Sequence, residues 1–286
     1  MKSFSPTYRF FSSDESIWTE VYFHNQYNLP ALLPSDVVVD VGAHTGAFTC
    51  ACLSRGARRI IAFEPDPDSF TLAMCNIQEY LDCLEIAASV RVHNSAIWRS
   101  DREDILSITR TRFAEFYHSY HQAAQSTLFS DRDTVPVHSV GLDNILRPLR
   151  TVALLKLDCE GAEWPILLTA TQLGRVRRLL LEVHSIPWKS YELGRSIPAD
   201  LFSEFGHYTI EDLKLHLQEF GLLCVSEKIH WNCLNDPAFY FGQVAFERGE
   251  KSAQSQTSLM DRLEWFADSE VEVAIKANEH RAEMIK

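Results

Sequence analysis

The sequence predicts an α/β protein with a mostly parallel sheet, helices on both faces and an antiparallel hairpin as the last pair of strands. Five short apolar segments alternate with helix-like stretches, as strands and crossover helices do in βαβ units. Two later apolar segments are joined by a loop too short to hold a crossover helix, so we expect them to pair antiparallel. The seven expected strands are 37–41, 59–63, 90–94, 152–157, 178–183, 222–226 and 239–246.

Composition narrows the possible partners and the compartment. The 286 residues are 46% hydrophobic, which is ample for a core, and 27 basic against 39 acidic residues give a net charge of −12. Such a charge argues against a nucleic-acid partner. No apolar run is long enough to span a bilayer, and the N-terminus lacks the apolar core of a signal peptide. We therefore expect a cytoplasmic protein with no membrane partner.

The chain divides into three parts. Residues 1–34 are expected to form an N-terminal helical cap, since apolar residues recur there at helical spacing before two prolines. The sheet domain covers 35–248, and its polar and aromatic stretch 101–134 reads as an insertion or lid. The acidic extension 249–286 has one amphipathic helical pattern, through which we expect two copies to pair as a homodimer.

The ends of the first two strands point to a ligand. The first strand carries Asp40 and leads through a small-residue turn, Gly42 to Gly46, into a helix-like segment. Parallel sheets hold nucleotides at such turns. Glu64 ends the second strand, 24 residues after Asp40, close to the offset at which an acid binds ribose hydroxyls. These acids indicate a cofactor that contains adenosine.

Several blocks together resemble the FkbM family of S-adenosylmethionine-dependent methyltransferases over roughly residues 14–247. Its most specific block is Lys-x-Asp-x-Glu-Gly-x-Glu at 156–163. The other blocks are 40–46, 63–67, 94–97 and 181–184. The resemblance implies the Rossmann-like class I methyltransferase fold, S-adenosylmethionine as cofactor, and methyl transfer to a hydroxyl of a small molecule such as a sugar or polyketide. His44 stands where methyltransferases at large carry a glycine.

The chemistry of the cofactor suggests a role for each residue at the first two strand ends. Gly42 and Gly46 would let the backbone approach the cofactor, because a Cβ there would collide with it. Asp40 would attract the cofactor's ammonium group, unless it merely caps the next helix. The two oxygens of Glu64 match a ribose diol. His44, in the same turn, is expected to bind the cofactor as well.

Further cofactor contacts are expected beyond Glu64. Pro65 follows it alongside the adenine, and Ser95 lies beside Asn94 after the third strand. The amide of Asn94 can pair with an adenine edge or simply form a turn. Trp98 can stack on the ring, although a core position is more common for such a residue.

Catalysis is expected at the ends of the fourth and fifth strands. Asp158 would face the methionine end of the cofactor and the transferring methyl group. An attacking hydroxyl must lose its proton, and His184 is our candidate for the base, with Glu182 as its orienting partner or as an alternative base. His44 is a second choice. Glu163 fits catalysis or a favourable position at a helix N-terminus equally well.

A divalent metal and two other functions remain open from the sequence. Asp158, Glu160, Glu182 and His184 offer oxygens and an imidazole that could hold Mg²⁺, but the acidic turn has a non-metal explanation, so we assign no metal ligand. One alternative function is a catalytically silent cofactor-binding or scaffold protein. Another, a nicotinamide-dependent oxidoreductase, lacks the Gly-x-Gly-x-x-Gly spacing.

Overall fold

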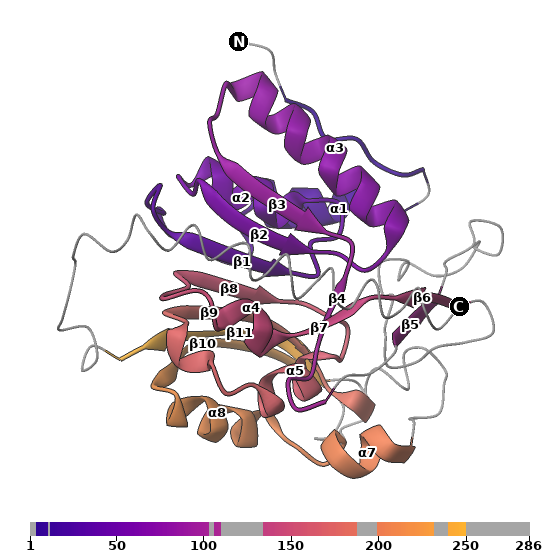
Figure 1. The fold of residues 1–286 in the computed structure, drawn as a ribbon, viewed down its shortest axis with the longest axis vertical. Coiled ribbons are helices and arrows are strands. Elements are labelled where there is room, and N and C mark those ends of the chain that lie inside the picture. The colour runs from indigo at the N-terminus through magenta and orange to yellow at the C-terminus, as the bar shows by residue number, and fades with distance from the viewer. Residues whose placement is uncertain are drawn as a thin grey trace.

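The fold is that of a seven-stranded, mostly parallel sheet with an antiparallel hairpin, as expected (Figure 1). The computed structural model describes residues 4–10, 12–102, 106–109, 134–187, 199–231 and 240–249. The strands of the sheet are β1 (Val37–Val41), β2 (Arg59–Phe63), β3 (Ser89–His93), β8 (Leu154–Leu157), β9 (Arg178–His184), β10 (Leu222–Trp231) and β11 (Tyr240–Arg248). Their order is β10-β11-β9-β8-β1-β2-β3.

Strand direction follows from the connections. Strands β1, β2, β3, β8 and β9 run parallel, and β11 pairs antiparallel with both β9 and β10. β1 is buried along its whole length, which is why it reads as a continuous β-branched run rather than an alternating one. Because the five parallel strands end at one edge, the residues that follow them meet there.

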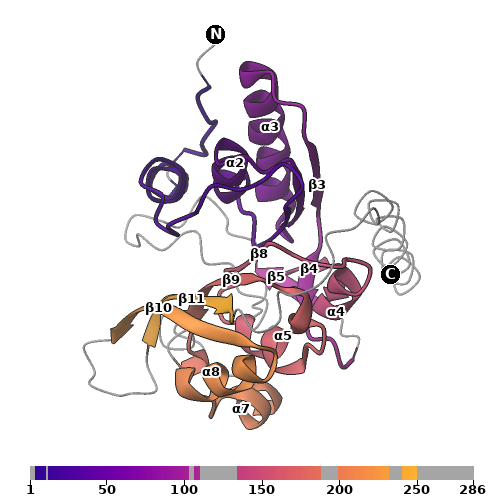
Figure 2. The same cartoon turned by 90° about the vertical axis from the view of Figure 1, so that its left-hand side faces the viewer.

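Helices cover both faces of the sheet (Figures 1 and 2). One face carries α1 (Asp14–Trp18), the π-helical turn η1 (Thr19–Phe23), α2 (Ala47–Ser54) and α3 (Pro67–Leu84). The other carries α4 (Leu142–Leu146), α5 (Glu163–Thr169), the 3₁₀ turn η2 (Leu173–Arg175), α7 (Ala199–Phe205) and α8 (Ile210–Glu219).

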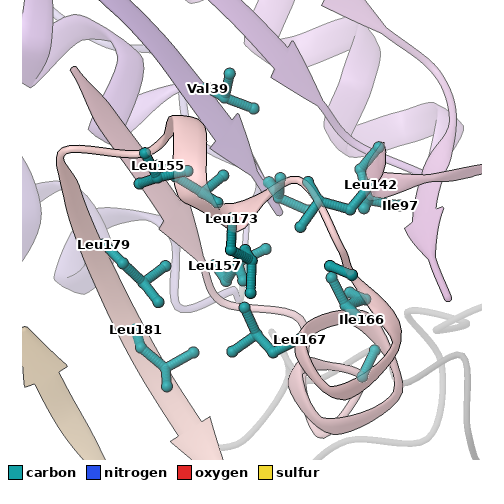
Figure 3. Close-up of a cluster of buried hydrophobic side chains, with 14 of the residues drawn as sticks. Val39, Ile97, Leu142, Leu155, Leu157, Ile166, Leu167, Leu173, Leu179 and Leu181 are labelled. Carbon is teal, nitrogen blue, oxygen red and sulfur yellow. The ribbon is translucent and has the colours of Figure 1, made fainter. Parts of the chain in front are cut away.

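Alternation along the strands divides the core into two clusters. Val39 and Leu155 point toward the α4–α5 side, where leucines of β8, β9 and the helices interdigitate (Figure 3). Val38, Leu154 and Leu180 point to the opposite side, against α1–α3. Even-numbered residues of these strands therefore face the helices of the N-terminal half, which fixes the face on which the candidate site lies.

The N-terminal cap is less helical than expected. Among the residues described before β1, only 14–23 is helical, and the stretch from there to β1 runs without regular structure, consistent with the prolines that limit helix formation there. It nevertheless packs on the sheet, since Trp18, Tyr27 and Leu29 are buried in the same cluster as α2 and α3.

Two short strand pairs lie at the expected insertion 101–134, one flanking it and one reaching into its two ends. β4 (Ala96–Trp98) pairs parallel with β7 (Ser139–Gly141), and β5 (Leu106–Thr109) pairs antiparallel with β6 (Thr134–Val137). The aromatic centre of the insertion and the acidic helix expected at 249–286, apart from Gly249, lie outside the described residues. Within the described part of the chain, no helix has the length and apolar character needed to cross a membrane.

Candidate active site

The turn after β1 requires glycine for a reason that we did not expect. Gly42 has φ +78°, and a Cβ there would lie 2.0 Å from the backbone carbonyl oxygen of Asp158. At Gly46, with φ +94°, a Cβ would meet the side chain of Ile77 at 3.2 Å. A side chain at Gly42 would therefore collide with the protein's own β8 end, and one at Gly46 would crowd α3; contact of either glycine with a cofactor stays a prediction. His44 adopts φ +52° between the two glycines.

Glu64 is held at the end of β2 by backbone donors. One carboxylate oxygen accepts the N–H of His44 at 2.7 Å and the other accepts the N–H of Asp66 at 2.9 Å. The residue is 7% exposed, and burial raises the pKa of Glu64 to about 7 despite these two donors. The carboxyl group therefore stands at the expected strand end with its orientation fixed.

Asp40 and Lys156 form a buried pair beneath the turn. Asp40 is fully buried; its Oδ2 accepts the Thr49 hydroxyl at 2.8 Å, while its Oδ1 has no hydrogen-bond partner among the described residues. Lys156 Nζ lies 3.6 Å from that Oδ1 and donates to the carbonyl of Gly42 at 2.6 Å. Burial raises the pKa of Asp40. Asp40 thus contacts α2 through a threonine side chain and is not a helix cap.

Two of the expected cofactor contacts, Asn94 and Ser95, follow the third strand. The Asn94 amide donates to the backbone carbonyls of Glu64 and Pro65, at 2.9 and 3.0 Å, so it holds the β2–α3 turn together. This is the turn-forming role that we considered beside adenine pairing. Ser95 is fully buried, and its Oγ has no hydrogen-bond partner among the residues described. Trp98 lies in the core, 4% exposed.

An arginine from the N-terminal segment covers the turn. The Arg9 guanidinium donates to both carboxylate oxygens of Asp14 and to the Ser69 hydroxyl, and its Nη2 lies 2.7 Å from His44 Nε2. Arginine has no acceptor, so His44 Nε2 must receive this hydrogen bond. Burial lowers the pKa of His44 to about 4. His44 is therefore neutral with its Nε2 lone pair occupied, which makes it a poor base.

The ends of β8 and β9 bring three expected residues together. Asp158, Glu182 and His184 each offer a donor atom, and these atoms lie within 4.8 Å of one another. His184 Nε2 lies 3.9 Å from Glu182 Oε1. Burial, followed by the charge of Asp158, raises the pKa of Glu182 to about 7. This part of the site is accessible to solvent, since the Asp158 and Glu182 side chains are 28% and 25% exposed.

Tyr27 connects the N-terminal segment to this group. Its hydroxyl lies 3.3 Å from Asp158 Oδ2 and 3.2 Å from Glu182 Oε2, and its ring packs edge-on against Phe48. Burial raises the pKa of Tyr27 well above its ordinary value, so the hydroxyl keeps its one proton. One donor thus faces two carboxylates.

One of the two glutamates in the turn after Asp158 has a structural role. Glu163 is fully buried and accepts the backbone N–H groups of Cys159 and Gly161, at 2.6 and 2.9 Å. It therefore stabilises the turn into α5, the second of the two roles expected for it. Glu160, with φ +56°, places its Oε2 3.6 Å from His184 Nε2.

Three residues near this edge were not predicted from the sequence to be part of the site. Arg9 and Tyr27 lie in a segment without a recognisable motif, and no local pattern relates Tyr27 to Asp158, 131 positions later. Lys156 stands inside the most specific block, and its position in a buried strand was the available signal for a charged role.

The solved structures that this chain resembles are distant, with low identity and low TM-scores. Solved structures with similar folds include a putative RNA methyltransferase from Pyrococcus horikoshii, at 15% identity with TM-score 0.38, covering 88% of this chain and 92% of that one. A second is TrmK from M. capricolum with S-adenosylhomocysteine, at 9% identity with TM-score 0.42, covering 84% and 72%. A third is magnesium protoporphyrin IX methyltransferase from Synechocystis with bound SAH, at 12% identity with TM-score 0.35, covering 82% and 81%. At such scores the likenesses carry no argument about function.

The sequence itself decides the family. No curated protein matches it. The model of the methyltransferase FkbM domain matches residues 40–217, which is more than half of the chain and includes the turn after β1, Glu64, and the strand ends of β8 and β9. The protein is a methyltransferase, and the chain belongs to the FkbM family.

Proposed function

We propose that the protein transfers a methyl group from S-adenosylmethionine to a hydroxyl oxygen of a small molecule. The observation that carries this proposal is the convergence of Asp40, Glu64 and Asp158 at one edge of the parallel sheet, around a turn with two positive-φ glycines. An acid after the second strand suits the ribose hydroxyls of an adenosine cofactor, and the other two acids would attract the ammonium of its amino-acid end and its positively charged sulfur.

Two orphaned polar atoms support the choice of cofactor. Asp40 Oδ1 and Ser95 Oγ are buried without a hydrogen-bond partner among the described residues, and buried polar groups normally have one. The polar edge of an adenine near Ser95 would supply the missing hydrogen-bond partner there, and a cofactor ammonium near Asp40 would add to the ion pair that its Oδ1 makes with Lys156 at 3.6 Å. Glu64 would accept the ribose hydroxyls with the lone pairs that His44 and Asp66 leave open.

S-adenosylmethionine, when bound, supplies a methyl group on a positively charged sulfur. The protein's own task is mainly alignment of the acceptor oxygen with that carbon, which rigid strand ends perform better than loops. Asp158 would face the charge of the reacting centre. The attacking hydroxyl loses its proton, and the group of Asp158, Glu182 and His184 is where we place that step, with His184 as the expected base.

The acceptor is proposed to be a small hydroxylated molecule rather than a nucleic acid. A net charge of −12 opposes the approach of a polyphosphate chain. The acidic group at the ends of β8 and β9 would repel phosphates further, whereas a neutral polyol carries no such penalty. The cytoplasmic location and the homodimer remain predictions.

The test begins with calorimetric titration of the full chain with S-adenosylhomocysteine. We expect one site per chain, and binding reduced at least tenfold in Asp40→Asn, with exposed Glu79→Gln on α3 as the matched control. Absence of binding by folded protein freed of copurified ligand would refute the cofactor assignment. Binding without transfer to any of a panel of hydroxylated acceptors would favour the silent scaffold instead.

The catalytic assignment has its own test. His184→Ala is expected to abolish transfer to an accepted small molecule while S-adenosylhomocysteine binds as in the wild type, because we place the imidazole at the acceptor side. Normal turnover in that variant would remove His184 from the mechanism. Transfer to RNA but not to small hydroxylated molecules would refute the proposed substrate class.

A further inference from the structure

We propose that Asp158, Glu182 and His184 form a binding site for a divalent cation, and that this cation holds an acceptor through two neighbouring oxygens. The acceptor part of this inference rests on the proposed function. The cation site itself rests on the geometry of three side chains and can be measured without cofactor or acceptor.

Strand geometry places the three side chains on one face at one edge. Leu157 of β8 pairs with Leu181 of β9, so Asp158 and Glu182 stand one position beyond that pair. Glu182 and His184 are two residues apart on a strand, which puts both on the face that Leu180 shares with α1–α3. The Trp164 indole donates to the carbonyl of His184 at 2.8 Å and fixes the end of β9. The donors are thus held by rigid elements.

The donor set suits a divalent ion. It comprises two carboxylates and an imidazole, and its donor atoms lie within 4.8 Å of one another. Ligands on opposite sides of an Mg²⁺ or Ca²⁺ ion stand roughly 4–5 Å apart, so one ion can reach all three after small side-chain rotations. His184 is 6% exposed while the two carboxylates are about a quarter exposed. The His184 nitrogen would bind the ion from the buried side and the two carboxylates from the exposed side. Coordination positions would therefore stay open toward solvent.

A second observation comes from outside the three ligands. Tyr27, from the N-terminal segment, aims a buried hydroxyl at Asp158 Oδ2 and Glu182 Oε2 simultaneously, at 3.3 and 3.2 Å. A hydroxyl has one proton, so it cannot donate to both carboxylates at once. Both distances are also long for a hydrogen bond to an anion. A partner of this kind orients metal-binding carboxylates without neutralising them.

The lysine beside Asp158 and Glu182 does not balance their negative charge by itself. Lys156 Nζ lies 3.5 Å from Asp158 Oδ2, but it also lies 3.6 Å from Asp40 and gives its short hydrogen bond to the carbonyl of Gly42. Glu160 adds a further carboxylate, 3.6 Å from His184 Nε2. The described charges around the group therefore favour an added cation.

A bound cation changes the task of these residues in methyl transfer. The ion would bind the acceptor hydroxyl and lower its pKa, so that its proton passes to water at the exposed side as the oxygen attacks. The O–H bond breaks, an O–CH₃ bond forms, and the C–S bond breaks with its electron pair returning to sulfur. His184 would then act as a ligand instead of a base. A vicinal diol or similar pair of oxygens would fill the open positions.

The test uses the full chain, treated with chelator and titrated with Mn²⁺ alone, with free Mn²⁺ followed by electron paramagnetic resonance. We expect one Mn²⁺ per chain and at least tenfold weaker binding in Asp158→Asn, Glu182→Gln and His184→Gln. Glu79→Gln, exposed on α3, removes one charge elsewhere and is expected to bind Mn²⁺ as the wild type does. Circular dichroism verifies that each variant is folded.

The outcomes separate this inference from the proposed function. No stoichiometric Mn²⁺, or Mn²⁺ retained by all three variants, overturns the cation site. If wild-type protein binds S-adenosylhomocysteine but no Mn²⁺, the proposed function stands and the cation site falls. If it binds Mn²⁺ at these residues but no S-adenosylhomocysteine, the reverse holds.

Discussion

The position of Glu64 leads to a specific prediction about the pH dependence of cofactor binding. The pKa of this carboxyl group is raised to about 7 by burial, so at pH 6 about nine in ten molecules carry it protonated. Ribose hydroxyls bond more strongly to the anion, by about 1 kcal/mol for each bond. Two such bonds give about 2 kcal/mol, which is about thirtyfold in the dissociation constant.

We therefore expect S-adenosylhomocysteine to bind about fifteenfold more tightly at pH 8 than at pH 5.5, because the bound ribose also lowers the pKa of Glu64 and keeps part of the complex ionised at the lower pH. Glu64→Gln should bind within about twofold of the wild type at pH 5.5, where Glu64 of the free protein is almost entirely protonated, and about thirtyfold more weakly at pH 8. Calorimetry at several pH values measures both. The ligand's own amine titrates alike in the two proteins, so the ratio of their affinities isolates Glu64.

The carboxyl group of Glu182 also has a pKa of about 7, so Glu182→Gln is the control that separates the two. It should keep the pH dependence that Glu64→Gln loses. Equal affinity of wild type and Glu64→Gln across the whole range would refute the role of Glu64 as the ribose-binding acid. A dependence that disappears in Glu182→Gln instead would assign the titration to the acceptor side.

Three further predictions concern stability, each measured by denaturant unfolding. Gly42→Ala should lower the free energy of unfolding by at least about 2 kcal/mol, because its Cβ would lie 2.0 Å from a carbonyl oxygen. The control Gly174→Ala, which has open space around it, should change it by less than about 0.5 kcal/mol. Equal effects of the two substitutions would contradict the packing argument. Arg9→Met should cost about 3 kcal/mol at pH 7, since it leaves the buried Asp14 without its cation. Although burial alone would raise it, the hydrogen bonds from Arg9 keep the pKa of Asp14 below its ordinary value, so this contribution is present above about pH 4 and is lost as the pH falls; a variant with unchanged acid sensitivity would refute it. Tyr27→Phe should lose about 1 kcal/mol while S-adenosylhomocysteine affinity stays within about threefold; a larger loss of affinity would place the hydroxyl in the cofactor site.

The fold could be predicted from the sequence because its signals are local. Each strand of the sheet is a separate apolar run, and the short connection before β11 excludes a crossover, so direction and number of strands follow from pattern alone. Strands β4 to β7 are three or four residues long, and segments of that length leave too little periodicity to recognise. The end of the N-terminal helix at Phe23 likewise lacks a clear stop signal.

The site could be predicted only where it follows strand ends. Asp40, Glu64 and Asp158 belong to such motifs, and the structure places them at the same edge. Tyr27 and Arg9 could not be found, because their roles depend on how the N-terminal segment packs over the sheet. The contact between Gly42 and the carbonyl of Asp158 could not be predicted either, because it depends on the neighbouring strand.

The position of β11 within the sheet has a consequence for the order in which the molecule can be completed. β11 is the last of the described strands to leave the ribosome, yet it lies between β9 and β10. Until it is synthesised, β10 has no partner in the sheet and β9 has an unpaired edge beside a buried leucine-rich face. Such edges are templates for pairing between chains. Nascent chains stalled before Tyr240 should therefore depend on chaperones far more than the finished protein does.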